Sequence, residues 1–229
     1  MSAIATNLQA VRQRIADAAR AAGRKPESVQ LLAVSKTWPA DAILTAAEAG
    51  QHAFGENYAQ EALHKMSELQ HRPLEWHFIG PVQSNKTRPV AEHFDWVHSV
   101  NRPKIAERLC AQRPAHLPPL QVCIEINVSG EQSKSGCPPD GAAALCGAVA
   151  ALPRLRLRGL MTIPAPTEDL AQQRLAFRKL RDLFERLRRD GLPVDTLSMG
   201  MSHDLEAAIA EGATIVRVGT AIFGTRNHP

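Results

Sequence analysis

The chain has 229 residues, which suits one α/β barrel better than two ordinary domains, so we expect a single domain over 1–229. Its net charge of +4 is modest and does not indicate nucleic acid binding. Only 4% of the residues are aromatic, so the core must be built mainly from Leu, Ile, Val and Ala. The four cysteines form no C-x-x-C pair and have no histidine at metal-like spacing, which argues against a zinc site and a disulfide framework and favours a reducing cytoplasm.

The first 23 residues have the pattern of an amphipathic helix. Their apolar side chains recur in steps of three and four: Ile4, Leu8, Val11, Ile15 and Ala18. Charged residues interrupt this stretch, so it matches neither a signal peptide nor a membrane span. We therefore expect an extra helix ahead of the first strand.

Eight strand-like runs follow, separated by helical patterns. They cover 31–36, 52–57, 75–80, 95–100, 120–128, 156–163, 196–200 and 215–224. The helical segments between them are well signalled: Pro39 suits the first turn of one helix, and Asp190-Gly191-Leu192-Pro193 ends another over about 170–190. This alternation predicts parallel βαβ units, and eight successive units favour a closed (β/α)8 TIM barrel over an open doubly wound sheet.

The first run ends in a lysine, Lys36. A primary amine condenses with an aldehyde only when it is unprotonated, whereas a free lysine has a pKa of about 10.4. Burial in an apolar strand would lower that pKa, so Lys36 is a candidate imine-forming residue at the mouth of the barrel. Other runs also end in polar residues, among them Asn57 and His77. Because barrel active sites lie at the carboxyl ends of the strands, these residues are candidates for function.

The last two runs predict a phosphate site opposite Lys36. Gly200 and Gly219 would let the backbone approach an anion, while Ser202 and Thr220 add hydroxyl donors. Taken singly, Ser202 also suits a helix N-cap and Gly219 a packing role, but their joint position favours the phosphate site. If Arg217 points inward together with Gly219, its guanidinium lies between this site and Lys36, where an aromatic ring would fit.

At this point the sequence resembles the YggS/PROSC family of pyridoxal phosphate homeostasis proteins, from about residue 4 to 226. The motifs that carry the resemblance are Ala33-Val34-Ser35-Lys36, Phe54-Gly55-Glu56-Asn57-Tyr58, His77-Phe78-Ile79-Gly80, Gln83-Ser84-Asn85-Lys86, Asn127-Val128-Ser129, Lys134-Ser135-Gly136, Gly159-Leu160-Met161, Ser198-Met199-Gly200-Met201-Ser202 and the run 216–224. One departure follows Ser202: the family has two acidic residues there, and this chain has His203 and Asp204.

The resemblance implies a pyridoxal 5'-phosphate (PLP) binding barrel of fold type III, similar to the N-terminal domain of alanine racemases. Lys36 would carry PLP as an imine, and Arg217 would face the pyridine nitrogen. The other implied contacts are Ser202, Gly219 and Thr220 at the phosphate and Asn57, His77 and Met161 along the ring. No metal is implied.

We expect a carrier of PLP and not an enzyme. Such racemases place a lysine on one face of the substrate and a tyrosine from a separate domain on the other. We expect no such domain, because the chain ends at Pro229 directly after the eighth run, and its one tyrosine is Tyr58. An arginine opposite the pyridine nitrogen would also leave that nitrogen unprotonated and weaken the ring as an electron sink. Apo enzymes that use PLP are expected partners, with no nucleic acid or membrane, and the chain is expected to be a cytoplasmic monomer.

Two alternatives keep Lys36 in an active role. A small PLP-dependent amino-acid racemase would need a second base, for which His203, His77 and Cys137 are candidates. A sugar-phosphate enzyme working through a lysine imine would explain the phosphate site but not Arg217. Two further features are open: the basic helix over 174–189 suits a solvated face better than a nucleic acid surface, and Lys134 suits either a second PLP site or a solvated loop.

Overall fold

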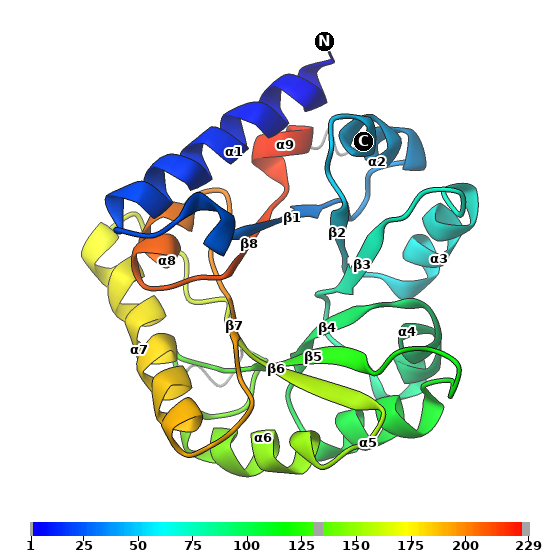
Figure 1. The fold of residues 1–229 in the computed structure, drawn as a ribbon, viewed down its shortest axis with the longest axis vertical. Helices are drawn as coiled ribbons and strands as arrows, with labels where there is room; N and C mark the ends of the chain where they lie inside the picture. The colour runs from blue at the N-terminus through cyan, green and yellow to red at the C-terminus, as the bar shows by residue number, and fades with distance from the viewer. Residues whose placement is uncertain (1, 131–134, 226–229) are drawn as a thin grey trace.

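The computed structural model describes residues 2–130 and 135–225. Within them, parallel strands pair in chain order into a closed barrel (Figure 1). The strands are β1 (Gln30–Val34), β2 (Ala53–Glu56), β3 (Glu75–Phe78), β4 (Trp96–Val100), β5 (Leu120–Glu125), β6 (Leu155–Met161), β7 (Thr196–Ser198) and β8 (Ile215–Val218). Pairing of β1 with β8 closes the ring, which confirms the predicted (β/α)8 TIM barrel.

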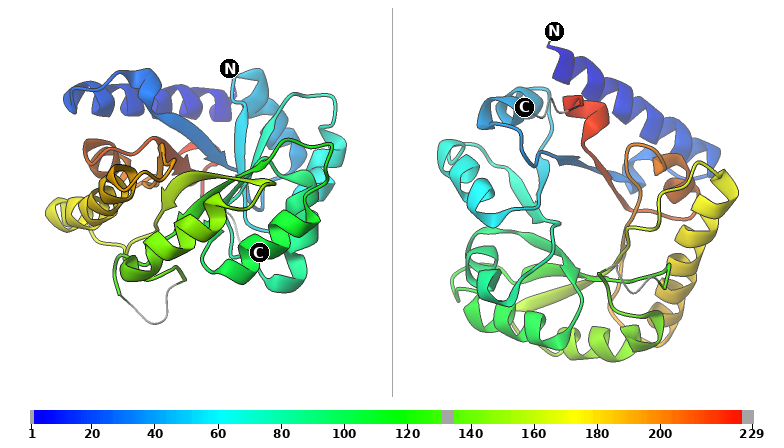
Figure 2. Two further views of the ribbon diagram at one scale, coloured as in Figure 1. Left: turned by 60° about the horizontal axis from the view of Figure 1, so that its bottom comes forward. Right: turned by 180° about the vertical axis from the view of Figure 1, so that it is seen from behind.

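Helices form the outer layer of the barrel on all sides (Figure 2). They are α1 (Ala3–Ala21), α2 (Ala40–Glu48), α3 (Ala59–Glu68), α4 (Thr87–His93), α5 (Pro103–Gln112), α6 (Ala142–Ala150), α7 (Leu170–Arg189), α8 (Leu205–Ala210) and α9 (Thr220–Phe223). Helix α1 is the extra N-terminal helix, and it packs against α8 and α9. Its buried residues, Leu8, Val11, Ile15 and Ala19, are spaced as one helix face requires.

The apolar core has two layers. The larger layer lies between the strands and the helices and is built mainly from aliphatic side chains, as the low aromatic content predicts. The smaller layer fills the inside of the barrel with Leu32, Ala53, Trp96, Cys123, Met161 and Ile215. Residues along a strand alternate between these two layers, so positions two apart share a side of the sheet.

Several predicted strands extend past the observed ends. The first ends at Val34, so Lys36 lies in the following turn and not in the strand. The predicted strand over 215–224 is wrong in its second half, where Thr220–Phe223 forms helix α9. Its apolar residues have the composition of a strand, but they pack outside the barrel, where Phe223 stacks on Trp38 at 5.8 Å between ring centroids.

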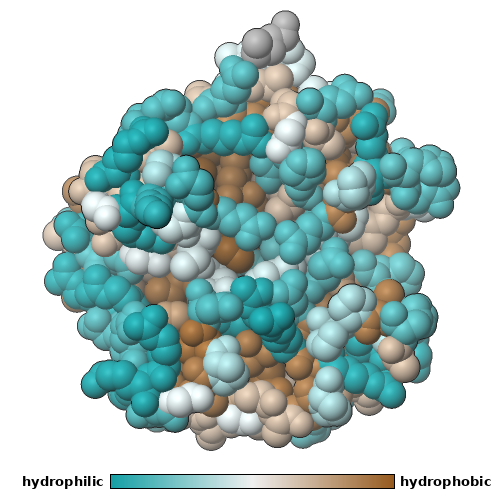
Figure 3. All heavy atoms as spheres, viewed as in Figure 1, coloured by the Kyte–Doolittle hydropathy of each residue, from teal (hydrophilic) through white to brown (hydrophobic). Residues whose placement is uncertain are grey.

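Across the described residues, no helix combines the length and the apolar character needed to cross a bilayer. Figure 3 shows hydrophilic residues over most of one face of the molecule, with apolar residues visible between them.

Candidate functional site

A cavity of about 470 Å³ lies at the carboxyl ends of the strands. Its lining consists of Val34, Lys36, Asn57, Ile79, Ile163, Met201, Ser202, His203, Arg217, Gly219, Thr220 and Thr225. Six of the eight predicted site residues are in this set: Lys36, Asn57, Ser202, Arg217, Gly219 and Thr220. Segments from β1, β2, β7 and β8 therefore converge on one space, as the positions of the polar strand ends predict.

Lys36 is half-buried in a tight turn after β1. The next residue, Thr37, has a φ of 67°, a left-handed conformation that is costly for a β-branched side chain. Its backbone N–H donates to Glu61 Oε1 at 2.5 Å, which holds the turn against helix α3. The surrounding structure thus fixes a strained backbone directly beside the candidate imine residue.

A buried ion pair lies beneath this turn. Lys65 Nζ on α3 lies 2.8 Å from Glu56 Oε1 at the end of β2 and 2.5 Å from Glu61 Oε1, and it donates to the backbone oxygen of Ser35 at 2.9 Å. The Ser35 hydroxyl donates to the same Glu56 oxygen at 2.7 Å. Burial raises the pKa of Glu56, although Lys65 opposes the shift. This cluster joins the ends of β1 and β2 to α3 and so supports the Lys36 turn.

Arg217 projects from β8 toward the cavity and is almost completely buried. Its Nη1 donates to Ser198 Oγ at 2.7 Å, and its Nη2 donates to the backbone oxygen of Thr162 at 2.9 Å. Burial lowers the pKa of Arg217 to about 10, which still leaves the guanidinium charged at neutral pH. The site therefore presents a fixed cationic donor that does not readily give up its proton.

Acidic groups face this guanidinium from two sides. Burial raises the pKa of Glu125 on β5 to about 7, and the charge of Arg217 opposes that rise. Burial also raises the pKa of Asp204, whose Oδ1 accepts the backbone N–H of Met201 at 2.6 Å. Asp204 thus orders the loop after β7, and the neighbouring His203 is exposed and lines the cavity.

The part of the cavity where β8 ends beside β1 has the features of an anion site, so this site lies next to the Lys36 turn and not across the mouth from it as the sequence predicts. A side chain at Gly219 would approach the backbone oxygen of Val34 to 3.1 Å, so a glycine here lets the end of β8 lie close against the end of β1. Thr220 begins helix α9, and the first N–H groups of a helix have no intrahelical partner. The loop that carries Ser202 is tethered by Arg14 on α1, whose Nη2 donates to the Ser202 backbone oxygen at 3.2 Å.

Asn57 lines the cavity and carries an unpaired acceptor. Its Oδ1 is buried and has no hydrogen-bond partner among the described residues. A buried unpaired acceptor is costly unless a ligand supplies a donor. The cavity therefore combines an amine, a fixed cation, an anion site and an unpaired acceptor, which fits a ligand that carries both a phosphate and polar ring substituents.

Two predicted ring contacts, His77 and Met161, are not among the lining residues. Both are fully buried in the barrel interior, where Met161 packs in the inner core and His77 stacks on Trp96 at 5.2 Å between centroids. Both residues lie on strands, as predicted, but their side chains point into the barrel interior below the cavity. Of the other predictions, Lys134 lies outside the described residues.

Sequence reasoning missed the interior partners of Arg217. These are Ser198, Thr162, Glu125 and, one contact further, His98. Two of them could have been found from strand alternation, because residues two positions apart on a strand point to the same side. Ser198 lies two positions before Gly200, and Glu125 lies two positions before Asn127. Thr162 has no such signal, since it contributes a backbone oxygen.

Known proteins share this sequence and fold. The family model described as alanine racemase, N-terminal domain, matches residues 6–227. A pyridoxal phosphate homeostasis protein of Pseudomonas aeruginosa is 63% identical over 228 residues, covering 100% of this chain and 98% of its own length. One of the same name from Escherichia coli is 55% identical over 231 residues, covering 100% of this chain and 99% of its own.

Solved structures agree with these relatives. PipY of Synechococcus elongatus, solved with PLP bound, is 38% identical with a TM-score of 0.84 and covers 96% of this chain and 100% of that chain. Alanine racemase from Corynebacterium glutamicum shares the fold at 21% identity and a TM-score of 0.69, covering 97% of this chain and 61% of that chain. The resemblance drawn from the motifs is confirmed, and the chain belongs to the pyridoxal phosphate homeostasis protein family, built on the alanine racemase N-terminal barrel.

Proposed function

We propose that this protein binds PLP in the cavity, holds it as an imine on Lys36 and serves PLP homeostasis without dedicated catalysis. The observation that carries the proposal is the convergence of Lys36, Arg217 and the Gly219–Thr220 backbone on one cavity. An amine, a charged ring partner and a phosphate site are the three contacts that PLP requires. Bound PLP supplies an aldehyde carbon that accepts an amine.

The chain's own residues have separate roles in this arrangement. Ser202, Gly219 and Thr220 hold the phosphate through hydroxyl and backbone donors, and Asn57 lines the cavity beside the ring. Arg217 orients the ring through its remaining N–H groups. His77 and Met161 act on the ring only indirectly, from the barrel interior. The closed barrel supports the prediction that 1–229 is one domain.

Absorption spectroscopy tests the imine. Purified protein mixed with PLP is expected to show an imine band in the near ultraviolet or visible range, and Lys36→Ala is expected to lose it. Lys86→Ala is the matched control, because Lys86 is exposed after β3 at the same end of the barrel and does not line the cavity. A band that survives in Lys36→Ala, or is absent from the wild type, contradicts the proposal.

The composition of the cavity supports a carrier. Racemisation needs one group on each face of the substrate carbon to remove and return a proton. The chain's one tyrosine, Tyr58, is 58% exposed and is not a lining residue. Arg217 remains protonated and leaves the pyridine nitrogen without a proton, which disfavours carbanion chemistry.

One observation favours the racemase alternative: His203 lines the cavity together with Lys36. The other two candidate bases are less suited, because His77 and Cys137 are buried outside the lining, and burial raises the pKa of the Cys137 thiol. Exchange of the α-proton of amino acids in D₂O separates the two functions. A carrier shows no exchange above free PLP, whereas a racemase shows exchange that Lys36→Ala abolishes and His203→Gln reduces.

The setting of the protein follows from the same proposal. We infer that it is a cytoplasmic monomer that passes PLP to apo enzymes. Its four cysteines are free, which suits a reducing compartment. Ile163 and Met201, two exposed apolar residues on the cavity lining, provide a rim that an acceptor protein can approach. A kinetic assay that follows activation of a PLP-dependent apo enzyme by the loaded protein tests the transfer.

A further inference from the structure

A row of buried polar side chains crosses the barrel interior from the cavity to the opposite end. Arg217 Nη1 lies 2.7 Å from Ser198 Oγ, Ser198 Oγ lies 2.8 Å from His98 Nδ1, and His98 Nε2 lies 2.9 Å from His77 Nδ1. His77 Nε2 in turn lies 3.3 Å from Glu75 Oε2. The four residues from Arg217 to His77 are at most 4% exposed. Four buried polar side chains and the partly exposed Glu75 at the amino end of the barrel thus lie in contact in one row.

The two ends of the row differ in chemistry. Arg217 lines the cavity and only donates hydrogen bonds. Glu75 is the first residue of β3, so it lies at the amino end of the barrel, and contact with His77 together with hydrogen bonds from Trp96 and Gln30 lowers its pKa to about 2. Its carboxylate therefore only accepts. His77 Nε2 has no hydrogen-bond partner in the described structure, so the Glu75 carboxylate acts on this nitrogen through its negative charge and not through a well-formed hydrogen bond.

The charge at Glu75 fixes the direction of every bond in the row. A lone pair on His77 Nε2 would be repelled by the carboxylate, so this atom carries the proton and His77 Nδ1 accepts. His98 then donates from Nε2 to His77 Nδ1 and accepts at its own Nδ1. The Ser198 hydroxyl must therefore donate its proton to His98 Nδ1. Both imidazoles are neutral here, because burial lowers the pKa of His77 and, more strongly, that of His98.

We propose that Glu75 is a positioning residue for Arg217, acting across the barrel through His77, His98 and Ser198. Because the Ser198 proton points to His98, the Ser198 oxygen is left to accept from Arg217 Nη1. With Thr162 accepting from Nη2, the guanidinium is held in one orientation toward the cavity. This role rests on the proposed function only in that PLP is the ligand Arg217 faces.

The tautomers of the two histidines test the direction of the row in the apo protein. Imidazole ¹⁵N chemical shifts distinguish a protonated ring nitrogen from an unprotonated one, and variants His77→Gln and His98→Gln assign the signals. We expect His77 and His98 each to be protonated only at Nε2 near neutral pH. Protonation of His98 at Nδ1, or of either ring at both nitrogens, overturns the proposal.

Glu75→Gln is expected to reverse the row. Trp96 Nε1 donates to Glu75 Oε1 at 2.7 Å, and it will keep the amide oxygen of the glutamine on that side. The amide nitrogen then takes the place of Oε2, which accepts from the exposed Gln30 Nε2 at 3.2 Å in the wild type, so the Gln30 amide must turn its oxygen inward. The new N–H group also faces His77 Nε2, which must accept, so both histidines move their proton to Nδ1. Glu27→Gln is the matched control, because Glu27 lines the same surface cavity as Glu75 but has no contact with the row. Unchanged tautomers in Glu75→Gln overturn the proposal.

The effect on Arg217 is measured by PLP binding. Once the hydrogen bonds of the row are reversed, His98 and Arg217 both donate to Ser198 Oγ. The hydrogen bond from Arg217 to Ser198 is then weaker, and the guanidinium is less firmly oriented. We expect Glu75→Gln to bind PLP about tenfold more weakly than Glu27→Gln, the effect of one charge-assisted hydrogen bond. Equal affinities overturn the positioning role. If the wild type binds no PLP, the proposed function fails instead, while the tautomers still decide the direction of the row.

Discussion

Arg217 and Glu125 together set the charge inside the barrel. Arg217 stays protonated with a pKa of about 10, while burial raises the pKa of Glu125 from 4.5 to about 7. Near neutral pH the guanidinium therefore faces a carboxyl that is only partly ionised. The charge that Arg217 meets from β5 therefore changes over the physiological pH range.

The raised pKa of Glu125 predicts a loss of stability on the alkaline side. Between pH 4.5 and about 7 the folded protein holds a proton that the unfolded chain has released, so the free energy of unfolding falls as the pH rises. The full contribution is about 3 kcal/mol at most, from the size of the shift. Urea unfolding at pH 5 and pH 8 measures it. Glu125→Gln should lack this component, and an equal pH dependence in both proteins would contradict the assignment.

Single residues also mark the limit of what the sequence predicts. Lys36, Arg217 and Gly219 could be found because each lies at or near the end of an apolar run. His77 could be placed on its strand but not in its layer, since the depth of a side chain in a barrel depends on strand stagger and on neighbours such as Trp96. The partners of Arg217 come from three other strands or loops, and although strand alternation marks Ser198 and Glu125 as candidates, it does not predict that they meet Arg217.

At the scale of elements, α3 is attached to the barrel by a buried charge cluster. Lys65 on this helix neutralises Glu56, which is fully buried at the end of β2. Removing one partner of such a pair leaves an uncompensated charge in the interior. The Lys36 turn depends on the same cluster through Glu61 and Thr37.

Lys65→Met is therefore expected to destabilise the protein by about 3 kcal/mol, because Glu56 is left unpaired. The double variant Lys65→Met/Glu56→Gln should recover a large part of this loss, since it removes both charges. Thermal or urea unfolding measures the free energy of unfolding of the two variants and shows how much of the loss is recovered. A double variant no more stable than the single one would show that packing, and not charge, holds α3 in place.

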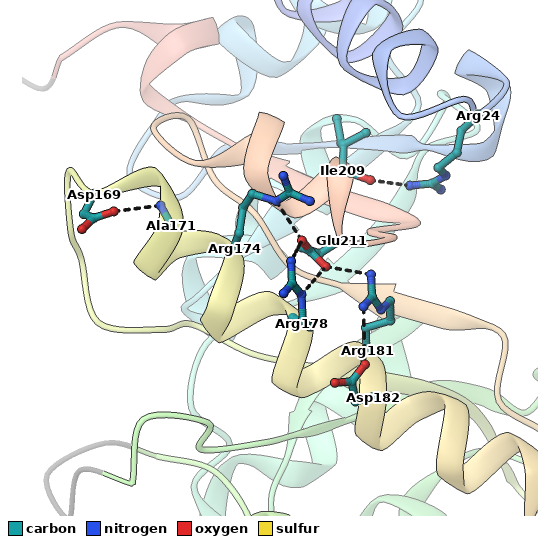
Figure 4. A network of polar contacts seen from close by, with 9 residues as sticks. All are labelled: Arg24, Asp169, Ala171, Arg174, Arg178, Arg181, Asp182, Ile209 and Glu211. Atoms are coloured by element: carbon teal, nitrogen blue, oxygen red, sulfur yellow. Dashed lines mark hydrogen bonds and ion pairs between the residues drawn. The ribbon is translucent and has the colours of Figure 1, made fainter.

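A second charge cluster joins α7 to α8 (Figure 4). Arg174, Arg178 and Arg181 on α7 converge on Glu211, whose carboxylate is fully buried at the end of α8. Burial alone would raise the pKa of Glu211, but hydrogen bonds and charge from the arginines outweigh it and lower the pKa. Part of the basic charge of α7 is thus paired within the molecule, while the solvated face expected for this helix stays a prediction.

This sharing predicts an asymmetry between the partners. Glu211→Ala removes the common acceptor and should destabilise the fold by about 2 kcal/mol. Arg178→Met should have a much smaller effect, because the other two arginines still neutralise the carboxylate. Unfolding measurements at low salt compare the two variants. Equal losses would mean that each arginine is needed separately.

Element boundaries were the least predictable part of the fold. Helix α7 was expected over about 170–190 and spans Leu170–Arg189, because an Asp-Gly-Leu-Pro stop follows it. Helix α9 was missed, because Ala221, Ile222 and Phe223 have the same apolar composition as a strand. The run changes to helix at Gly219, and this helix packs on α1. Asn7 Nδ2 on α1 donates to the Ile222 backbone oxygen at 3.0 Å. Because this contact joins residues far apart in the sequence, a local pattern does not reveal it.

At the scale of the whole molecule, closure of the barrel brings the ends of the chain together. Pairing of β1 with β8 places Lys36 next to the Gly219–Thr220 backbone, although the two segments lie near opposite ends of the sequence. The order of the eight runs was enough to predict this closure.

Sedimentation velocity tests the proposed monomer. The protein should sediment at the mass of one chain with and without PLP, whereas an increase in sedimentation coefficient with concentration would indicate a dimer.

Covalent trapping of the cofactor tests the central claim most directly. Borohydride reduction of the PLP-loaded protein converts an imine into a stable amine, and mass spectrometry of its peptides locates the modified lysine. We predict a reduced pyridoxyl phosphate group on Lys36 in the wild type and in Lys86→Ala, and none in Lys36→Ala. A modification on another lysine, or no modification in the wild type, would contradict the account.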